Sequence, residues 1–545
     1  MMTSIVPAGR AFGAPQVRIK LPNQGQFQGH SDGQDNGQDN GQDNGQDNGQ
    51  SQGSFSGLNL WASAHRWLHV MSNRAPGAAT LLVAVGIFMT HTLATAQTKQ
   101  MNHNGPAPHS NPQLSTGGAE PAIHLHVEKY TLSNGLKVLL YEDHSSPLVS
   151  YQTWFRVGSK YEHPGLTGIA HLFEHLMFKG SKKYTGEQFD QILQSNGATN
   201  NAFTTQDYTG YYENLPSEKI ETIMDVEADR MQFLNVTLEN LTSEREVVKE
   251  ERRYRVDNNP NGILHEVLYE TAYHVHPYRW PVIGSMADLA NVTAENATEF
   301  YKTFYAPSNA TLVIAGDFNP TIVKAMIDKH YGTIPSHVIP ELKLAAEPVQ
   351  NSPRSQFVSR DVQNVSFILA YHTPKTGSPD SYALDLLASI LGNGDSSRLH
   401  QRLVYRDQTA AGVNAFNSSL QDSGLFEVYV ALKPGADFSK AQRAAYGEIW
   451  RPRHLGVTSA ELEKAKNQLM KDYIDGLKSI HGKAESIALN ETIYGDYTRL
   501  FTDLDRYNEV TVAQIRTVAE KYLAPEMSTI VVLRPLKSPS KKGAQ

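Results

Sequence analysis

Two histidines and a glutamate occur close together in the sequence His-Leu-Phe-Glu-His, which begins at His171 and ends at His175. Apolar residues flank them at helical spacing, with Thr167 as the expected N-cap and Gly180 as the expected stop, so we predict a helix of about three turns. His171 and His175 then lie one turn apart on one face, and Glu174 points the same way. Two neutral imidazole nitrogens and a neighbouring carboxylate are what zinc-dependent hydrolysis requires.

This pentapeptide alone leaves two interpretations open. A chain with 21 histidines can show the spacing by chance, and such histidines can simply satisfy hydrogen bonds in a core or at a surface. On the other hand, H-x-x-E-H inverts the commoner zinc-peptidase order H-E-x-x-H and is a catalytic signature in its own right, the inverzincin motif. The decision therefore depends on the rest of the chain.

A second pair of carboxylates follows in a segment that we predict to be helical from Glu244 to about Val256, with Ser243 starting a capping box and Pro260 lying beyond the end. Glu244 and Glu251 are seven residues apart, so they share one helix face two turns from each other. The adjacent Glu250 is the competing candidate for a metal ligand.

Composition narrows the chemistry. The chain has 545 residues, enough for two to four domains, and 40% of them are hydrophobic. Its formal charge of −7, without a basic run, makes nucleic-acid binding a poor prediction. Cysteine is absent, which excludes disulfides, thiolate metal sites, a cysteine nucleophile and a lipoprotein anchor. Any metal must be held by histidine and carboxylate.

The N-terminal region carries targeting signals rather than a core. Residues 1–70 are of low complexity, and we predict them to be disordered, with Met71 as the expected true start of the protein. Residues 71–96 read as a signal peptide, from Met71 through a short apolar stretch to Ala96, and 97–125 read as a linker. A membrane anchor is the alternative, but the apolar stretch is short of the ~20 residues that a span needs. We therefore expect a periplasmic or secreted bacterial protein without a permanent membrane anchor.

The folded part begins at residue 126. Residues 126–141 predict two strands joined by a turn at 133–135, 149–157 predict a third strand, and 194–212 predict a strand pair. Residues 216–233 predict a helix between this pair and the carboxylate segment.

An internal repeat follows. Thr293 and Pro307 bracket a helix that leads into an apolar strand, and Thr511 and Pro525 do the same at identical spacing. We infer two diverged copies of one α+β unit, residues 126–340 and 353–538, with a linker at 341–352 and a tail at 539–545. The corresponding region of the second copy, 381–398, has no histidine pair, so only the first copy is expected to hold metal.

These features together resemble the pitrilysin/insulinase family of zinc peptidases, in the half-length form of bacterial members and of mitochondrial processing peptidase subunits. The resemblance rests on H-x-x-E-H and on the segment Glu-Arg-Glu-Val-Val-Lys-Glu-Glu at 244–251. It extends through Asn-Ala-Phe-Thr at 201–204, His-Pro-Tyr at 276–278, Gly284 and Tyr-Ala-Pro at 305–307. It implies two homologous domains, each a mostly antiparallel sheet packed with helices, that form one half of a clam-shaped peptidase.

The resemblance also assigns roles within the site. It makes His171, His175 and Glu251 the zinc ligands and Glu174 the general base. Glu251 is preferred to Glu250 for two reasons. The family's glutamate falls six residues after the arginine of a Glu-Arg pair, which here is Glu244-Arg245, and Glu251 shares a helix face with Glu244. Glu244 would orient a histidine through its ring N–H.

Substrate contacts are implied for the strand at 201–204. Asn201 and Ala202 would lie on an edge strand that pairs with an extended peptide by strand addition, although an ordinary hairpin is the alternative on the residues alone. The pattern His-x-His at 274–276 could suggest a second metal, but in this family His-Pro-Tyr is a structural turn.

The chain departs from the family pattern in its second half. The family usually supplies an arginine and, seven residues later, a tyrosine that clamp substrate and stabilise the oxyanion; here Val404 and Ala411 occupy those positions. Neither side chain can donate a hydrogen bond, and losing such a donor commonly costs ~10²–10³ in rate. We therefore expect a homologous partner subunit that carries the Arg/Tyr pair, as a heterodimer, with a homodimer possible.

Two functions remain in competition. The first is a zinc metalloendopeptidase that hydrolyses unfolded peptides or small proteins. The second is a non-catalytic structural or binding subunit on the same fold. The complete set of ligands and base favours the peptidase, and bound zinc is the observation that discriminates between them.

Overall fold

The computed structural model describes residues 125–536. The predicted low-complexity region, signal peptide, all but the last residue of the first linker, and the C-terminal tail lie outside the described residues. Between residues 125 and 536, no helix combines the length and the apolar character that crossing a membrane requires.

The first half of the described chain is built on a six-stranded sheet in the order β1-β2-β6-β3-β5-β4. Only β2 and β6 run parallel, and the other neighbours are antiparallel. β4 is therefore an edge strand, as predicted for residues 201 and 202. The strands are β1 Val127–Thr131, β2 Lys137–Glu142, β3 Leu148–Phe155, β4 Thr199–Thr204, β5 Thr209–Pro216 and β6 Ala310–Gly316.

Helices of the first half pack on one face of this sheet, where they share a continuous apolar core with it. They are α2 Ile169–Leu176, α3 Gly186–Ser195, α4 Ile220–Phe233, α5 Leu238–Arg252, α7 Met286–Asn291, α8 Ala294–Phe304 and α9 Pro320–Tyr331. α6, Pro260–Ala272, belongs to the same stretch of sequence but packs elsewhere.

The second half repeats the topology with five strands in the order β7-β11-β8-β10-β9, again with a single parallel pair, β7 and β11. The strands are β7 Arg354–Arg360, β8 Ser366–Thr373, β9 Ala410–Ser418, β10 Gly424–Leu432 and β11 Ser528–Pro535. The helices are α10 Pro379–Gly392, α11 Phe438–Leu455, α12 Ser459–Gly476, α13 Ile480–Tyr494, α14 Arg499–Glu509 and α15 Val512–Tyr522.

Local sequence explains the repeated unit. Thr293 and Thr511 each close a capping box at the start of a helix, α8 and α15, which a prolyl turn connects to the central strand β6 or β11. The predicted α+β class with two related sheet units is confirmed. The predicted linker 341–352 lies within a stretch that has no helix or strand between α9 and β7.

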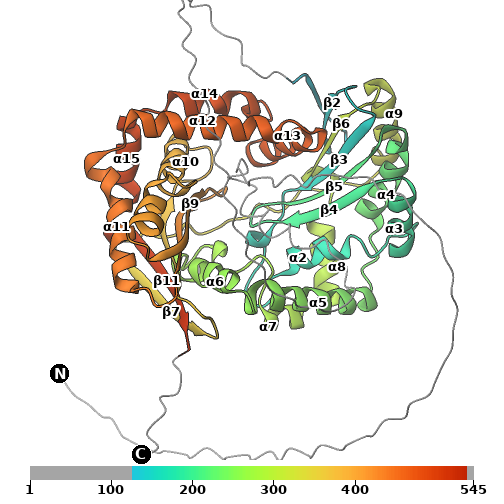
Figure 1. The fold of residues 1–545 in the computed structure, drawn as a ribbon. Coiled ribbons are helices and arrows are strands. Elements are labelled where there is room, and N and C mark those ends of the chain that lie inside the picture. The colour runs from blue at the N-terminus through green and yellow to red at the C-terminus, as the bar shows by residue number, and fades with distance from the viewer. Residues whose placement is uncertain (1–124, 537–545) are drawn as a thin grey trace, which may run out of the picture. The chain divides into compact units, whose positions relative to one another are not determined.

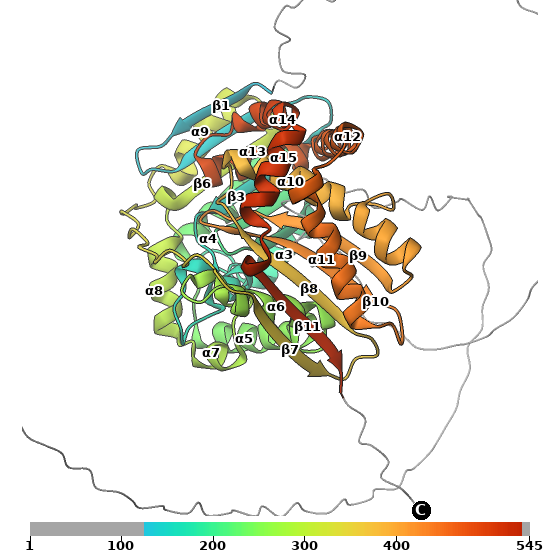
Figure 2. The same cartoon turned by 90° about the vertical axis from the view of Figure 1, so that its left-hand side faces the viewer.

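Each half lends a helix to the other. α6 packs on β8 and β11 of the second sheet, and α13 packs on β3 and β6 of the first (Figure 1). α10 and α15 cover the opposite face of the second sheet (Figure 2), so β8 is buried on both sides.

Ion pairs reinforce the contact of α13 with the first sheet. The fully buried Glu491 of α13 lies 2.7 Å from Lys129 Nζ and 2.9 Å from Lys137 Nζ. The two halves therefore share their cores.

Two predicted helix starts are wrong. α2 begins at Ile169, after Gly168 rather than Thr167, and ends at Leu176, before Gly180. The Thr167 hydroxyl donates instead to Asp288 Oδ2 at 2.6 Å and accepts from the Ser285 N–H at 3.1 Å, so it does not cap the helix. α2 consequently has about two turns rather than three.

The carboxylate helix starts earlier than predicted. α5 begins at Leu238, and its N-cap is Thr237, whose hydroxyl accepts a hydrogen bond from the Asn240 N–H. Ser243 lies inside the helix rather than at its start, because the upstream threonine provides a cap one and a half turns earlier. Beyond Arg252 the chain continues as a π-helical turn, Arg253–Asp257.

A tight contact fixes the start of α2. Gly284, with a φ of +77°, approaches the turn before α2 so closely that a Cβ there would lie 2.3 Å from Thr167 O. Its carbonyl accepts a hydrogen bond from Arg252 Nη1 of α5 at 2.7 Å. Gly284 thus connects the two helices that carry the predicted site.

We expect Gly284→Ala to lower the free energy of unfolding by about 1–3 kcal/mol from backbone conformation alone, with the clash adding to that loss. Thermal denaturation measures this effect. Gly447→Ala is the matched control: Gly447 is exposed within α11 with open space around it, so alanine there should stabilise by roughly 0.5–1 kcal/mol. Equal stability of the two variants would contradict the role of Gly284.

Candidate metal centre and catalytic site

α2 presents the three residues of the motif on one side and apolar residues on the other. Leu172, Phe173 and Leu176 are buried in the core of the first half, which anchors the helix. The side chains of His171, Glu174 and His175 lie on the remaining face and are largely buried, with 8%, 12% and 22% exposed.

α5 packs beside α2 and brings its carboxylates to the histidines. Glu251 Oε2 lies 3.2 Å from His175 Nε2 and 3.6 Å from His171 Nε2. Glu250, the competing candidate, is 70% exposed and pairs with Arg253. The structure therefore brings Glu251, and not Glu250, to the two histidines.

The arrangement fits a metal ion. One ligand atom each from His171, His175 and Glu251 lies within 4.8 Å of the others, and no other group of this kind is found among residues 125–536. Glu251 Oε2 is buried without a hydrogen-bond donor. Ligands of a tetrahedral zinc, at 2.0–2.1 Å from the ion, are separated by about 3.3 Å, close to the distances seen here.

Two further residues hold the ligands in place. Arg255, in the π-helical turn, lies 2.9 Å from Glu251 Oε1, which leaves Oε2 for the histidines. Glu244 Oε2 lies 3.5 Å from His175 Nδ1, and its other oxygen lies 2.7 Å from Lys179 Nζ. The contact with His175 places Glu244 where the sequence predicted it, behind a histidine.

The buried carboxylates and imidazoles perturb one another strongly. Burial alone would raise the pKa of Glu251, but His175, His171 and Arg255 outweigh it and lower the pKa to about 2. Burial would likewise lower the pKa of His175, but Glu244 and Glu251 raise it to about 9. Without metal the cluster therefore favours a proton on His175, which a metal ion would have to displace.

Glu174 differs from the other two acids. Burial raises the pKa of its carboxyl to about 7, against the opposing effects of His175 and of a hydrogen bond from Thr204. The Thr204 hydroxyl donates to Glu174 Oε2 at 2.7 Å. A carboxyl with a pKa near neutrality can both accept and release a proton, as a general base and acid must.

The edge strand β4 lies against this glutamate. Thr204 is its last residue, Ala202 is buried, and the Ala202 N–H donates to Oδ1 of Asn201 at 2.9 Å. Sequence reasoning did not single out Thr204 or Arg255, although Thr204 ends the Asn-Ala-Phe-Thr motif and Arg255 lies one helical turn after Glu251. These two positions in the sequence are the signals that could have identified Thr204 and Arg255 as site residues.

The second half has no equivalent centre. On α10, the counterpart of α2, the buried Asp385 accepts hydrogen bonds from Asn417 of β9 at 2.8 Å and from the Tyr507 hydroxyl at 2.7 Å. Val404 packs against the core of that half, and Ala411 is exposed on β9. In this half, hydrogen bonds from Asn417 and Tyr507 occupy both oxygens of the Asp385 carboxylate.

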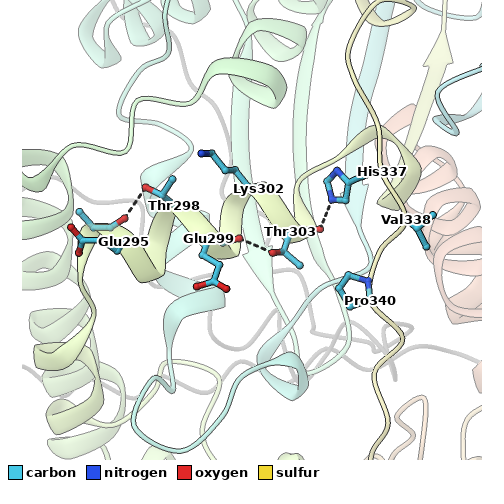
Figure 3. Close-up of a pocket in the computed structure, with 9 residues that line it drawn as sticks. Glu295, Thr298, Glu299, Lys302, Thr303, His337, Val338 and Pro340 are labelled. Carbon is cyan, nitrogen blue, oxygen red and sulfur yellow. Dashed lines mark hydrogen bonds between the residues drawn. The ribbon is translucent and has the colours of Figure 1, made fainter.

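Other candidate features do not join the site. His276 is the cap of a turn, and its Nδ1 accepts a hydrogen bond from the Tyr278 N–H, in agreement with the structural interpretation of His-Pro-Tyr. A surface groove of about 620 Å³ runs between α8 and the segment at His337 to Pro340 (Figure 3). No predicted site residue lines it.

Comparisons with known proteins agree with this geometry. Residues 137–285 match the family model for insulinase (peptidase family M16), and residues 291–469 match the model for the peptidase M16 inactive domain. The zinc protease PqqE of Helicobacter pylori is 32% identical over 418 residues, which cover 75% of this chain and 93% of that protein. This chain belongs to the M16 peptidase family.

Further relatives match this chain over nearly their whole length. An uncharacterized zinc protease of Bacillus subtilis, YmxG, is 24% identical over 74% of this chain and 98% of its own. The crystal structure of a protease from Helicobacter pylori matches with a TM-score of 0.73 and 31% identity, over 75% of this chain and all of that one. A peptidase M16 inactive domain from Pseudomonas fluorescens, at 19% identity and a TM-score of 0.69, shares the fold.

Neighbouring glutamates on α5 provide a direct test of the metal centre. We expect Glu251→Gln to abolish stoichiometric retention of added Zn²⁺, because it removes the anionic ligand between the two histidines. Glu250→Gln should bind Zn²⁺ like the unmodified chain, since Glu250 faces solvent. Metal content after gel filtration, measured by atomic emission, checks both variants. Retention of zinc by Glu251→Gln would contradict the ligand set.

Proposed function

We propose that this M16 chain is a zinc metalloendopeptidase that cleaves unfolded peptides or small proteins. The observation that carries the proposal is the convergence of His171, His175 and Glu251 beside Glu174, a carboxyl whose pKa burial raises to about 7. The names of its relatives as zinc proteases support the same metal and reaction class.

Each residue has a distinct task in this proposal. His171, His175 and Glu251 would hold the zinc ion, with Arg255 and Glu244 fixing the orientation of Glu251 and His175. A zinc ion with an open position supplies Lewis acidity, which lowers the pKa of water and polarises a carbonyl group.

Proton transfer falls to Glu174. In this proposal its carboxylate takes a proton from the attacking water and delivers it to the leaving amine, so that one group acts first as base and then as acid. Thr204 holds Oε2 through its hydrogen bond, so the other oxygen remains available for the proton.

We propose that the substrate lies extended along β4. An edge strand offers unpaired backbone groups on one side, and an extended peptide can pair with them through Asn201 and Ala202. Because Thr204 of the same strand contacts Glu174, a peptide in this register would pass beside the metal centre. Strand addition requires an unfolded segment, which explains the substrate class.

We also propose a homologous partner subunit. Val404 and Ala411 offer no hydrogen-bond donor for an oxyanion, and the match of residues 291–469 to the inactive-domain model fits a second half without its own chemistry. A partner that carries an arginine and a tyrosine would supply what this chain lacks. A homodimer is the alternative assembly, but a second copy of this chain would not supply the pair.

The decisive experiment measures hydrolysis of an unstructured peptide by the zinc-loaded chain, alone and mixed with a homologous subunit that carries the Arg/Tyr pair. We expect activity chiefly in the mixture, and Glu174→Gln should lower it by about 10²–10⁴-fold while keeping zinc. Full activity of the chain alone would refute the partner, and zinc-loaded but inactive mixtures would favour a non-catalytic subunit.

Localisation is a separate proposal. The signal peptide predicted at residues 71–96 supports a periplasmic or secreted protein. We expect N-terminal sequencing of the protein purified from its natural host to begin at or near Gln97. Recovery of peptides from residues 1–70 in the mature protein would contradict both the cleavage and the start at Met71.

A further inference from the structure

A short segment between β3 and α2, residues 158–162, joins the edge strand to the metal-binding helix. The Ser159 N–H donates to Thr205 O at 3.0 Å, and the Lys160 N–H donates to Gln206 O at 3.0 Å, so the segment binds the turn that follows β4. A Cβ at Gly158 would lie 2.4 Å from Thr205 O. The two backbones are therefore in direct contact.

The other end of the segment holds the start of α2. The Glu162 carboxylate accepts hydrogen bonds from the Gly168 N–H at 2.9 Å and from the Ala170 N–H at 2.8 Å. Acidic groups at a helix N-terminus are stabilised by its unpaired N–H groups and dipole. One short segment thus connects the helix of Glu174 to the strand of Thr204.

Lys160 ties this segment to two hairpin turns. Its Nζ lies 3.0 Å from Asp207 Oδ1 in the β4–β5 turn, and 3.1 Å from Asp422 Oδ2 in the β9–β10 turn of the second half. It also donates to Gln421 Oε1 at 2.7 Å. The side chains of Lys160 and Asp207 are only 5% and 3% exposed, so neither charge is stable there without the other.

The His-Pro-Tyr turn at 276–278 also contacts the two aspartates that Lys160 binds. The buried Tyr278 hydroxyl donates to Asp207 Oδ1 at 2.6 Å, and it accepts a hydrogen bond from the Asp422 N–H at 3.2 Å. The Gln421 N–H donates to Asp207 Oδ2 at 3.0 Å. Because His276 Nδ1 accepts from Tyr278, its Nε2 carries the proton and faces Asp422 Oδ2 at 3.5 Å.

We propose that Lys160 is a positioning residue for peptide hydrolysis: by holding Asp207 and Asp422 together, it sets the distance between the edge strand β4 and Glu174. This inference rests on the proposed function and adds a residue that touches neither metal nor substrate. Without the ammonium group, the buried Asp207 carboxylate loses its counter-charge beside the partly exposed carboxylate of Asp422, and the β4–β5 turn must move. A displacement of 1 Å at the reacting groups can cost ~10²-fold in rate.

The test compares Lys160→Met with Lys483→Met in the full chain, assayed with its partner subunit. Lys483 Nζ lies 2.6 Å from Asp143 Oδ2 and also bridges the two halves, but this pair touches neither the 158–162 segment nor β4. For each variant, kcat, KM, zinc content and melting temperature are measured, with hydrogen exchange of residues 158–162 and 203–208.

We expect Lys160→Met to lower kcat by about 10–100-fold, with KM nearly unchanged and zinc content preserved. Amides of the two segments should exchange faster. Lys483→Met should lower the melting temperature without changing kcat. Lys160→Arg, which retains the charge, should recover much of the lost kcat. If Lys160→Met does not fold, Asp422→Asn, whose side chain is partly exposed, should show the same pattern to a smaller degree.

Unchanged kcat in zinc-loaded Lys160→Met would overturn the proposal, and so would a loss of kcat that follows zinc loss. An equal loss in Lys483→Met would also overturn it, because the effect would then be one of general stability. If the unmodified protein holds zinc but cleaves nothing, the proposed function fails; the hydrogen-exchange comparison still decides whether Lys160 couples β4 to α2.

Discussion

The packing of α2 against α5 is the constraint on which the site depends. It gathers two imidazoles and three carboxyl groups from two helices in one largely buried place, where each charge is tolerated only because another compensates for it. The elements around the pair serve this contact: Gly284 and Arg252 connect the two helices, and Glu162 caps the start of α2. A metal ion would compensate charge in the same way, because it would neutralise Glu251 Oε2, the buried carboxylate oxygen that has no hydrogen-bond donor.

The two copies of the unit share a buried carboxylate at equivalent places, but only the first copy has the candidate metal ligands beside it. In both, a buried carboxylate on the helix after the second or third strand accepts a hydrogen bond from the edge strand, Thr204 to Glu174 in one and Asn417 to Asp385 in the other. In the second copy, Tyr507 occupies the remaining oxygen of the carboxylate. The duplicated scaffold has thus kept a strand-to-helix contact where it has no metal ligands. Burial raises the pKa of Asp385 to about 7 as well, so the perturbed acidity belongs to the scaffold.

Local pattern was enough to predict the strands of the first sheet and the duplication, whereas the grouping of the candidate ligands came from the family resemblance. Helical periodicity alone put Glu251 on the face of Glu244, and the structure brings both to His175. The failures have a common cause. Thr167 did not cap α2 because Asp288, more than a hundred residues away, takes its hydroxyl, and the amides are bonded by Glu162. Lys160 and the exchange of α6 and α13 likewise depend on contacts between distant segments, which no local spacing encodes.

The exchange of helices between the halves has a consequence for how the chain folds. Trp154 and Val313 of the first sheet are buried beneath α13, which lies more than 150 residues further along the chain. As the ribosome releases the chain from its N-terminus, the first sheet therefore has one apolar face exposed until residues 480–494 have emerged. Contacts of such long range slow folding and leave aggregation-prone surface open in the meantime. The half that contains His171, His175 and Glu251 is synthesised first but can be completed only when almost the entire chain is present.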